Sequence, residues 1–73
     1  MIQVKLDVPD ISCAHCEKTI LEALRGQPGV QAVAVSVPAK SVLLKYNEED
    51  ITLQKVEEIL DEEGYPVAAT HKL

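Results

Sequence analysis

The sequence is poor in aromatic side chains, with two tyrosines, Tyr46 and Tyr65, and neither tryptophan nor phenylalanine. Proteins that stack on nucleic-acid bases use aromatic rings, which this chain can barely supply. Basic residues are also in the minority, because seven Lys and Arg face twelve Asp and Glu, for a net charge of −5. A chain of this charge repels the phosphate backbone. We therefore expect no nucleic-acid partner.

Long apolar runs are missing as well. Runs such as residues 33–37 are far shorter than the roughly 20 residues of a membrane-spanning helix. The N-terminus has no basic segment followed by an apolar signal core, so we expect a cytoplasmic protein that is not embedded in a membrane. Seventy-three residues give one domain, over residues 1–73, whose small core favours a ligand held at the surface over a buried catalytic cavity.

Hydrophobic periodicity predicts six elements in the order βαββαβ. Alternating apolar residues indicate strands, and apolar residues three and four apart indicate helices. Glycines 26 and 64 are expected to end the helices, Thr52 to cap the second helix, and residues 38–40 to form a hairpin. The predicted ranges are a strand over 2–8, a helix over 14–25, strands over 32–37 and 41–46, a helix from 52 to 64 and a strand over 65–71.

This order is typical of a ferredoxin-like α+β sandwich, a four-stranded antiparallel sheet with both helices on one face. The last strand should lie at the sheet edge, because Pro66 cannot donate to a strand ladder. Following the chain up and down predicts that the loop after the first strand, the hairpin and the turn at Gly64 and Tyr65 share one end. His71 is expected as an exposed strand residue toward the opposite end.

Two cysteines, Cys13 and Cys16, stand where the first helix is expected to begin. Backbone N–H groups and the positive end of the helix dipole stabilise anions there, so both thiols should favour the thiolate form that binds metal. With no second cysteine pair, the chain cannot build a closed four-thiolate zinc site. Two soft sulfur ligands suit a two-coordinate thiophilic ion such as Cu(I).

The whole chain resembles the heavy-metal-associated domain family, which includes bacterial copper chaperones and the metal-binding modules of P-type ATPases. The resemblance rests on the segment Ser12-Cys13-Ala14-His15-Cys16 after the first strand, on the βαββαβ order, and on Glu63-Gly64-Tyr65 before the last strand. It implies that Cys13 and Cys16 hold Cu(I), with Ag(I), Zn(II) or Hg(II) as possible surrogates. Ser12, His15 and Tyr65 would surround that site.

The resemblance also implies that the metal passes by thiolate exchange to a partner. The expected partner is a metal-transporting P-type ATPase or its N-terminal metal-binding domains, and a metal-bridged homodimer is a further expectation. The family commonly has Gly-Met before the Ser or Thr, where this chain has Asp10 and Ile11. We expect Ile11 to fill an apolar socket beneath the loop. Zinc-type members tend to carry an acidic residue where this chain has Ser12.

Other functions fit the same residues. A Cys-x-x-Cys pair at a helix start also occurs in thiol-disulfide oxidoreductases, and a zinc- or mercury-binding regulatory domain of a metal transporter would look the same. We expect His15 to be a solvent-facing residue of the first helical turn rather than a direct ligand, from where it would tune thiolate basicity or shield the ion. Residues 61–63 crowd acidic charge at the end of the second helix, either as a docking patch for a basic partner or as a solvated face.

Overall fold

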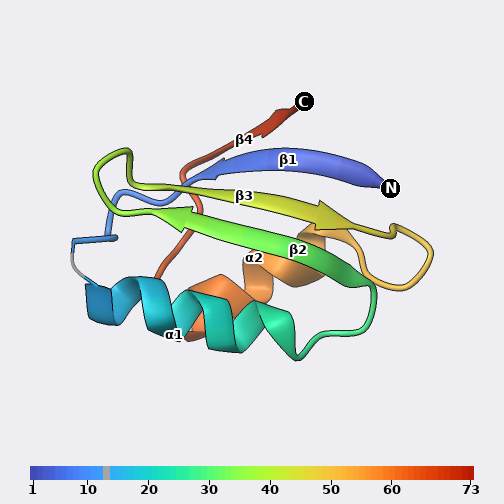
Figure 1. Cartoon of the computed structure of the whole chain (residues 1–73), viewed down its shortest axis with the longest axis horizontal. Helices are drawn as coiled ribbons and strands as arrows, with labels where there is room; N and C mark the ends of the chain where they lie inside the picture. Colours follow the sequence, from blue (N-terminus) through green and yellow to red (C-terminus); the bar gives the residue numbers. More distant parts are fainter. Residues whose placement is uncertain (13) are drawn as a thin grey trace.

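The computed structural model describes residues 1–12 and 14–73 and confirms the predicted order βαββαβ (Figure 1). The elements are β1 (Ile2–Asp7), α1 (Ala14–Arg25), β2 (Val30–Ser36), β3 (Ser41–Tyr46), α2 (Leu53–Glu62) and β4 (Ala69–Lys72).

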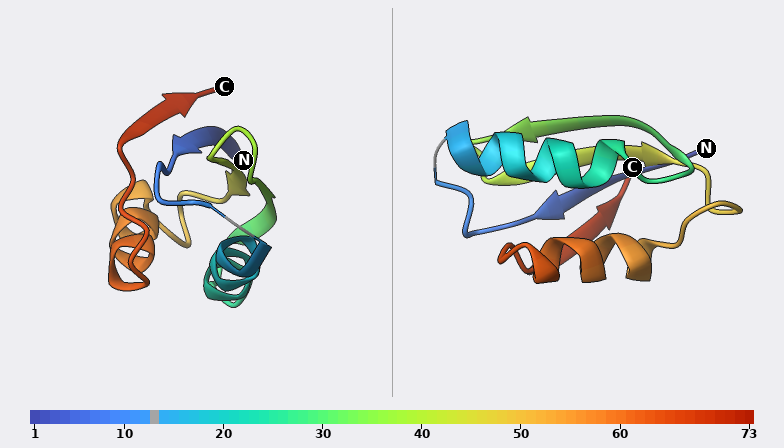
Figure 2. Two further views of the ribbon diagram at one scale, coloured as in Figure 1. Left: turned by 90° about the vertical axis from the view of Figure 1, so that its left-hand side faces the viewer. Right: turned by 90° about the horizontal axis from the view of Figure 1, so that it is seen from below.

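The strands form one antiparallel sheet in the order β2-β3-β1-β4. The register places Val4 opposite Leu44 in β3, and Asp7 opposite Ala69 in β4. Both helices cover the same face of this sheet, as the two turned views in Figure 2 show. The ferredoxin-like sandwich predicted from the sequence is therefore confirmed, with β4 at the edge where Pro66 was expected to keep it.

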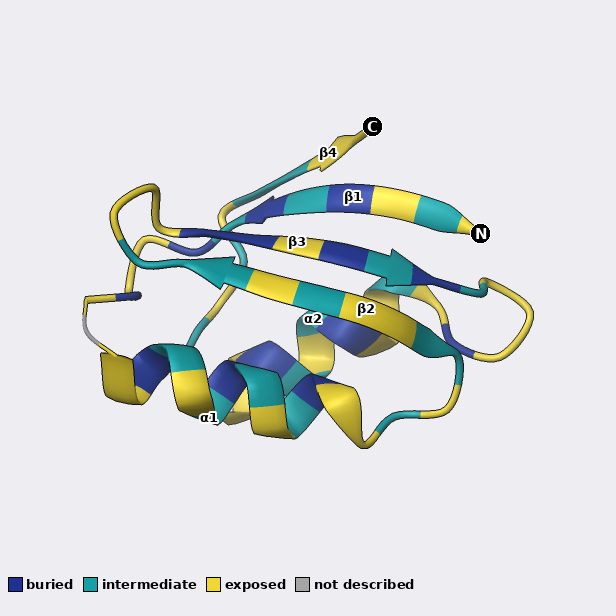
Figure 3. Cartoon of the chain, in the orientation of Figure 1, coloured by how far each residue is buried: buried dark blue, intermediate teal, exposed yellow. Residues whose placement is uncertain are grey.

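The core lies between the sheet and the helices. The alternation of β1 buries its apolar side chains toward the helices, while its polar residues point to the open face. The buried side chains come from β1 and the loop after it, from one stripe of each helix, and from β3 and the loop after β3 (Figure 3). They are Val4, Leu6, Val8, Ile11, Cys16, Ile20, Leu24, Val42, Leu44, Tyr46, Ile51, Val56 and Leu60.

Local signals set the helix boundaries. The Thr52 side chain accepts a hydrogen bond from the Lys55 N–H at 3.1 Å, the N-cap predicted from the sequence. Gly64, just after α2, has a φ of +87°, a conformation that glycine adopts without steric cost. Helix α1 ends at Arg25, before Gly26, but the positive φ in that connection belongs to Gly29.

Three connections meet at one end of the sandwich, as predicted. The loop after β1, the β2–β3 hairpin and the turn after α2 lie together at the left of Figure 1 and of the right-hand view in Figure 2. Two backbone hydrogen bonds link them to the end of β1: Val8 donates to the Lys40 carbonyl at 2.9 Å, and Ala68 donates to the Asp7 carbonyl at 2.8 Å. These bonds join the end of β1 to both neighbouring connections.

The prediction of a last strand over 65–71 was wrong at its start, because β4 begins at Ala69. The Tyr65 N–H donates back to the Leu60 carbonyl at 2.8 Å, and Pro66 has no N–H to donate. The backbone therefore pairs with β1 only from Ala68 onward.

The late start of β4 also corrects the placement of His71. In the β1–β4 register His71 lies opposite Lys5, and its Nε2 is 2.9 Å from Oδ2 of Asp7, at the end of β1 that leads into the cysteine loop. His71 is exposed, as predicted, but it does not lie far from that end of the sheet.

Candidate metal-binding site

Cys16 lies in the first turn of α1, on the face that packs against the sheet. Its residue is 8% exposed, and it shares the inner stripe of the helix with Ile20 and Leu24, one and two turns further on. The spacing of four residues places all three on one side of the helix. A thiol here is shielded by the core on one side yet lies at the helix start, where backbone N–H groups stabilise a thiolate.

The segment before the helix is anchored by Ile11. Its side chain is fully buried in the core, and its N–H donates to the Val8 carbonyl at 3.1 Å. The neighbouring Asp10 and Ser12 are exposed. The prediction that Ile11 fills an apolar socket beneath the loop is therefore confirmed, and this departure from the common Gly-Met pattern serves to pin the loop to the core.

Ser12 lies within hydrogen-bonding reach of Cys16. The Ser12 Oγ and Cys16 Sγ are 3.9 Å apart, a distance suited to a hydrogen bond to sulfur. When Cys16 is a thiolate, the sulfur can only accept, so the hydroxyl donates. Such a bond stabilises negative charge on sulfur and orients the side chain of a metal ligand.

His15 lies on the outer side of the same helical turn and is exposed. Its carbonyl accepts a hydrogen bond from Thr19 Oγ1 at 3.0 Å, while the imidazole belongs to the solvent-facing side of α1. This placement agrees with the solvent-facing interpretation. Direct ligation by His15 gains no support from it.

Tyr65 lies at the same end of the molecule as the cysteine loop, in the turn that follows α2 (Figure 2). It is half-buried and packs against the core, and its N–H fixes the turn through the Leu60 carbonyl. The topology prediction for this residue is confirmed. A direct contribution of Tyr65 to metal binding remains a prediction.

Cys13, the other predicted ligand, lies outside the described residues. Within residues 1–12 and 14–73, no group of three or more His, Cys, Asp or Glu side chains could hold a metal ion. The sequence analysis did not predict the hydrogen bond between Asp7 and His71. This bond could be predicted only from the antiparallel register of β1 and β4, which depends on where β4 begins.

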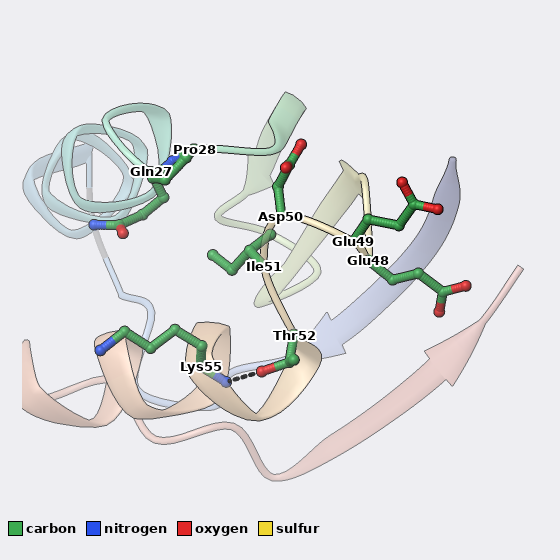
Figure 4. Close-up of a pocket in the computed structure, with 8 residues that line it drawn as sticks. All are labelled: Gln27, Pro28, Glu48, Glu49, Asp50, Ile51, Thr52 and Lys55. Carbon is green, nitrogen blue, oxygen red and sulfur yellow. Dashed lines mark hydrogen bonds between the residues drawn. The ribbon is translucent and has the colours of Figure 1, made fainter.

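The acidic loop after β3 is a separate feature at the other end of the molecule (Figure 1). It borders a hollow of about 300 Å³ with Gln27 and Pro28. Figure 4 shows the carboxylates of Glu48, Glu49 and Asp50 pointing in different directions rather than converging on one point. Beside this loop, burial raises the pKa of the Tyr46 phenol, and the nearby negative charge of Glu48 raises it further.

The acidic cluster Asp61–Glu63 is exposed and lies at the C-terminal end of α2, which also carries no basic residue in its last turn. Negative charge is unfavourable there because it meets the negative end of the helix dipole. This end of α2 is the one that approaches the cysteine loop.

No helix in the described part of the chain is both long and apolar enough to cross a membrane.

A family model for the heavy-metal-associated domain matches residues 5–66. The copper chaperone CopZ of Staphylococcus epidermidis is 31% identical over 67 residues, which cover 92% of this chain and 98% of the relative.

Solved structures of known proteins share the fold of this chain. A heavy metal binding protein from Thermotoga maritima is 35% identical, with a TM-score of 0.85 and coverage of 97% of this chain and 98% of that chain. The N-terminal domain of a potential copper-translocating P-type ATPase from Bacillus subtilis, in its Cu(I)-loaded state, is 23% identical with a TM-score of 0.83, covering 99% of this chain and 88% of that chain. At that identity the likeness shows the fold alone.

A match over most of the chain, a relative above 30% identity along nearly its whole length, and a ferredoxin-like sandwich with a cysteine in the first turn of α1 agree with one another. The alternative of a thiol-disulfide oxidoreductase loses its support, because the match is to a metal-binding domain rather than to an enzyme. The chain belongs to the heavy-metal-associated domain family and binds heavy metal.

Proposed function

We propose that this protein is a cytoplasmic copper chaperone, which holds one Cu(I) between the thiolates of Cys13 and Cys16 and transfers it to a partner domain. The observation that carries the proposal is the position of Cys16, a nearly buried thiol in the first turn of α1, three residues after a second cysteine. The name of the Staphylococcus epidermidis relative supports copper as the cargo.

The donor set fits Cu(I) better than Zn(II). Zn(II) in a structural site takes four ligands, commonly Cys and His, whereas soft thiolates select Cu(I). His15 is exposed on the outer side of α1, and the residue directly before Cys13 is Ser12 rather than a carboxylate. Ag(I) and Hg(II) are thiophilic as well, and we expect them to act as surrogates in vitro.

Transfer by ligand exchange follows from the low coordination number. A partner thiolate can add to the ion before Cys13 or Cys16 leaves, so the metal is never released into water. The expected partner is the metal-binding domain of a P-type ATPase, and the Bacillus subtilis ATPase domain of like fold, which was solved in its Cu(I)-loaded state, supports a partner that takes the same ion. The same exchange between two copies would give the metal-bridged homodimer.

The test is the rate of Cu(I) transfer under anaerobic conditions to a Cys-x-x-Cys acceptor, with the Bacillus subtilis ATPase domain as the probe. Exchange through a shared intermediate predicts a rate that rises with acceptor concentration and exceeds spontaneous release to a chromogenic chelator. A rate equal to spontaneous release at every acceptor concentration would contradict a chaperone. An acceptor whose two cysteines are replaced by serine is the matched control.

A further inference from the structure

The two edges of the sheet differ in how they are protected. At the β4 edge, Pro66 precedes the strand, and His71 and Lys72 lie within it. Prolines and charged side chains discourage another strand from pairing with an edge. The β2 edge has neither device inside the strand, because residues 26–39 contain no charged side chain and Val30–Ser36 contains no proline.

β2 is also the longest strand of the sheet, with seven residues, three of them valine. Its neighbour on one side is β3, and it forms the front edge of the sheet in Figures 1 and 3. Every second residue of an edge strand turns its N–H and C=O groups outward, which is a template for another strand. The pairing of β2 with β3 shifts register between Val30 and Ala32, so the regularly paired part of β2 runs from Ala32 to Ser36.

The charged segments at the two ends of β2 differ in sign, although the exposed Arg25 of α1 also borders the start of the strand, in a hollow that it shares with Val30–Val33. Near the start of the strand lies the acidic loop, because Asn47 donates to the Gly29 carbonyl at 2.8 Å and the loop continues through Glu48, Glu49 and Asp50. Beyond the end of the strand lies the hairpin with Lys40. An antiparallel second β2 would bring the acidic loop of each copy beside Lys40 of the other.

We propose that β2 is a self-association edge, at which two copies of this chain pair antiparallel about a two-fold axis through Ala34. In this register Val33 lies opposite Val35 of the second copy, and Ala32 lies opposite Ser36. Side chains that face each other are thus of similar size and uncharged, while Lys40 meets the acidic loop at both ends. The other acidic residues of the second half lie on α2 or at its C-cap, and α2 lies on the side of the molecule away from the β2 edge (Figure 2).

The pairing leaves the metal sites open. The end of β2 that leads into the hairpin lies on the same side as the cysteine loop, so an antiparallel pair points its two loops in opposite directions. Both copies could then exchange metal independently. This dimer needs no metal, unlike the one bridged through the cysteines.

Sedimentation velocity of the reduced, metal-free protein from micromolar to millimolar concentration tests the proposal. The sedimentation coefficient should rise with concentration for the wild type. Ala34→Lys, at an exposed position, puts two like charges face to face across the axis and should leave a monomer at every concentration. Leu43→Lys is the matched control on the open face of β3, 48% exposed, and should associate like the wild type.

A second variant keeps the test independent of strand stability. Lys40→Glu lies in the exposed hairpin and should weaken association at least threefold, because it turns attraction to the acidic loop into repulsion. A wild type that stays monomeric would overturn the proposal, and so would association unaffected by Ala34→Lys. Loss of association in Leu43→Lys would assign the contact to the open face instead. None of these results depends on Cu(I), so they leave the proposed chaperone function unaffected.

Discussion

The Ser12 hydroxyl lies 3.9 Å from the Cys16 sulfur, so a residue outside α1 contacts the nearly buried thiol of its first turn. Ser12 is exposed, and its hydroxyl adds a donor to the backbone N–H groups at the helix start. The pair therefore links the loop to a ligand of the proposed site.

Replacing Ser12 with alanine should lower Cu(I) affinity about tenfold, since the loss of a group that orients a metal ligand has effects of this size. The free energy of unfolding of this variant should be nearly the same as that of the wild type, because the Ser12 side chain is exposed. Ser12→Thr keeps the hydroxyl and should keep the affinity. Competition with a Cu(I) chelator measures both variants, and equal affinity for Ser12→Ala and wild type would remove Ser12 from the site.

Ile11→Ala should destabilise the protein by about 2–5 kcal/mol, because the side chain is fully buried and its removal leaves a cavity. Ile59→Ala is the matched control, since Ile59 is half-buried on α2 and should lose less. Thermal or urea unfolding gives both values. An Ile11→Ala loss no larger than that of Ile59→Ala would mean that the loop is not anchored through this residue.

The three glycines should rank by backbone conformation and by space. Gly26→Ala meets no atom closer than 4.0 Å and needs no positive φ, so stability should change by less than about 0.5 kcal/mol. Gly64→Ala has room but a φ of +87° and should cost about 1–2 kcal/mol. Gly29→Ala combines that φ with a Cβ only 2.6 Å from the Asp50 Cβ, so it should cost the most. Urea unfolding of the three variants checks the order, and a Gly29→Ala protein as stable as Gly64→Ala would contradict it.

Neutralising Asp61, Glu62 and Glu63 as amides should make Cu(I) transfer to a basic partner less sensitive to salt, because encounter would lose its electrostatic attraction. The free energy of unfolding should rise by about a few tenths of a kcal/mol per residue, because the unfavourable interaction between negative charge and the C-terminal end of the helix dipole is removed. Transfer rates across a salt series and thermal unfolding measure the two effects. The control is Glu57→Gln with Glu58→Gln, and an unchanged salt dependence in the triple variant would identify the cluster as a solvated face.

The sequence was sufficient where a pattern is local. The alternation of β1, the Thr52 cap and the apolar stripe through Val56 and Leu60 all depend on neighbours a few residues apart, and all are confirmed. The order of strands and helices alone also predicted that the turn at Tyr65 lies at the same end of the molecule as the cysteine loop, as Figure 2 shows.

The remainder depended on pairing between distant segments. The start of β4 is set by the Tyr65 N–H turning back to Leu60, a choice that apolar alternation does not encode. The position of His71 was wrongly predicted for the same reason, because the register of a strand determines which residue of the neighbouring strand its side chain reaches. The approach of Ser12 to Cys16 likewise depends on how the loop folds onto the core.

The central claim is that the two cysteines together hold Cu(I). The most direct test is anaerobic competition of the reduced protein for Cu(I) against a chromogenic chelator, repeated with Zn(II) and with Cys13→Ser, Cys16→Ser and His15→Ala. The account predicts that wild type and His15→Ala retain one Cu(I) in preference to Zn(II), and that each cysteine variant loses it. Tight retention of Cu(I) by either cysteine variant would contradict the account.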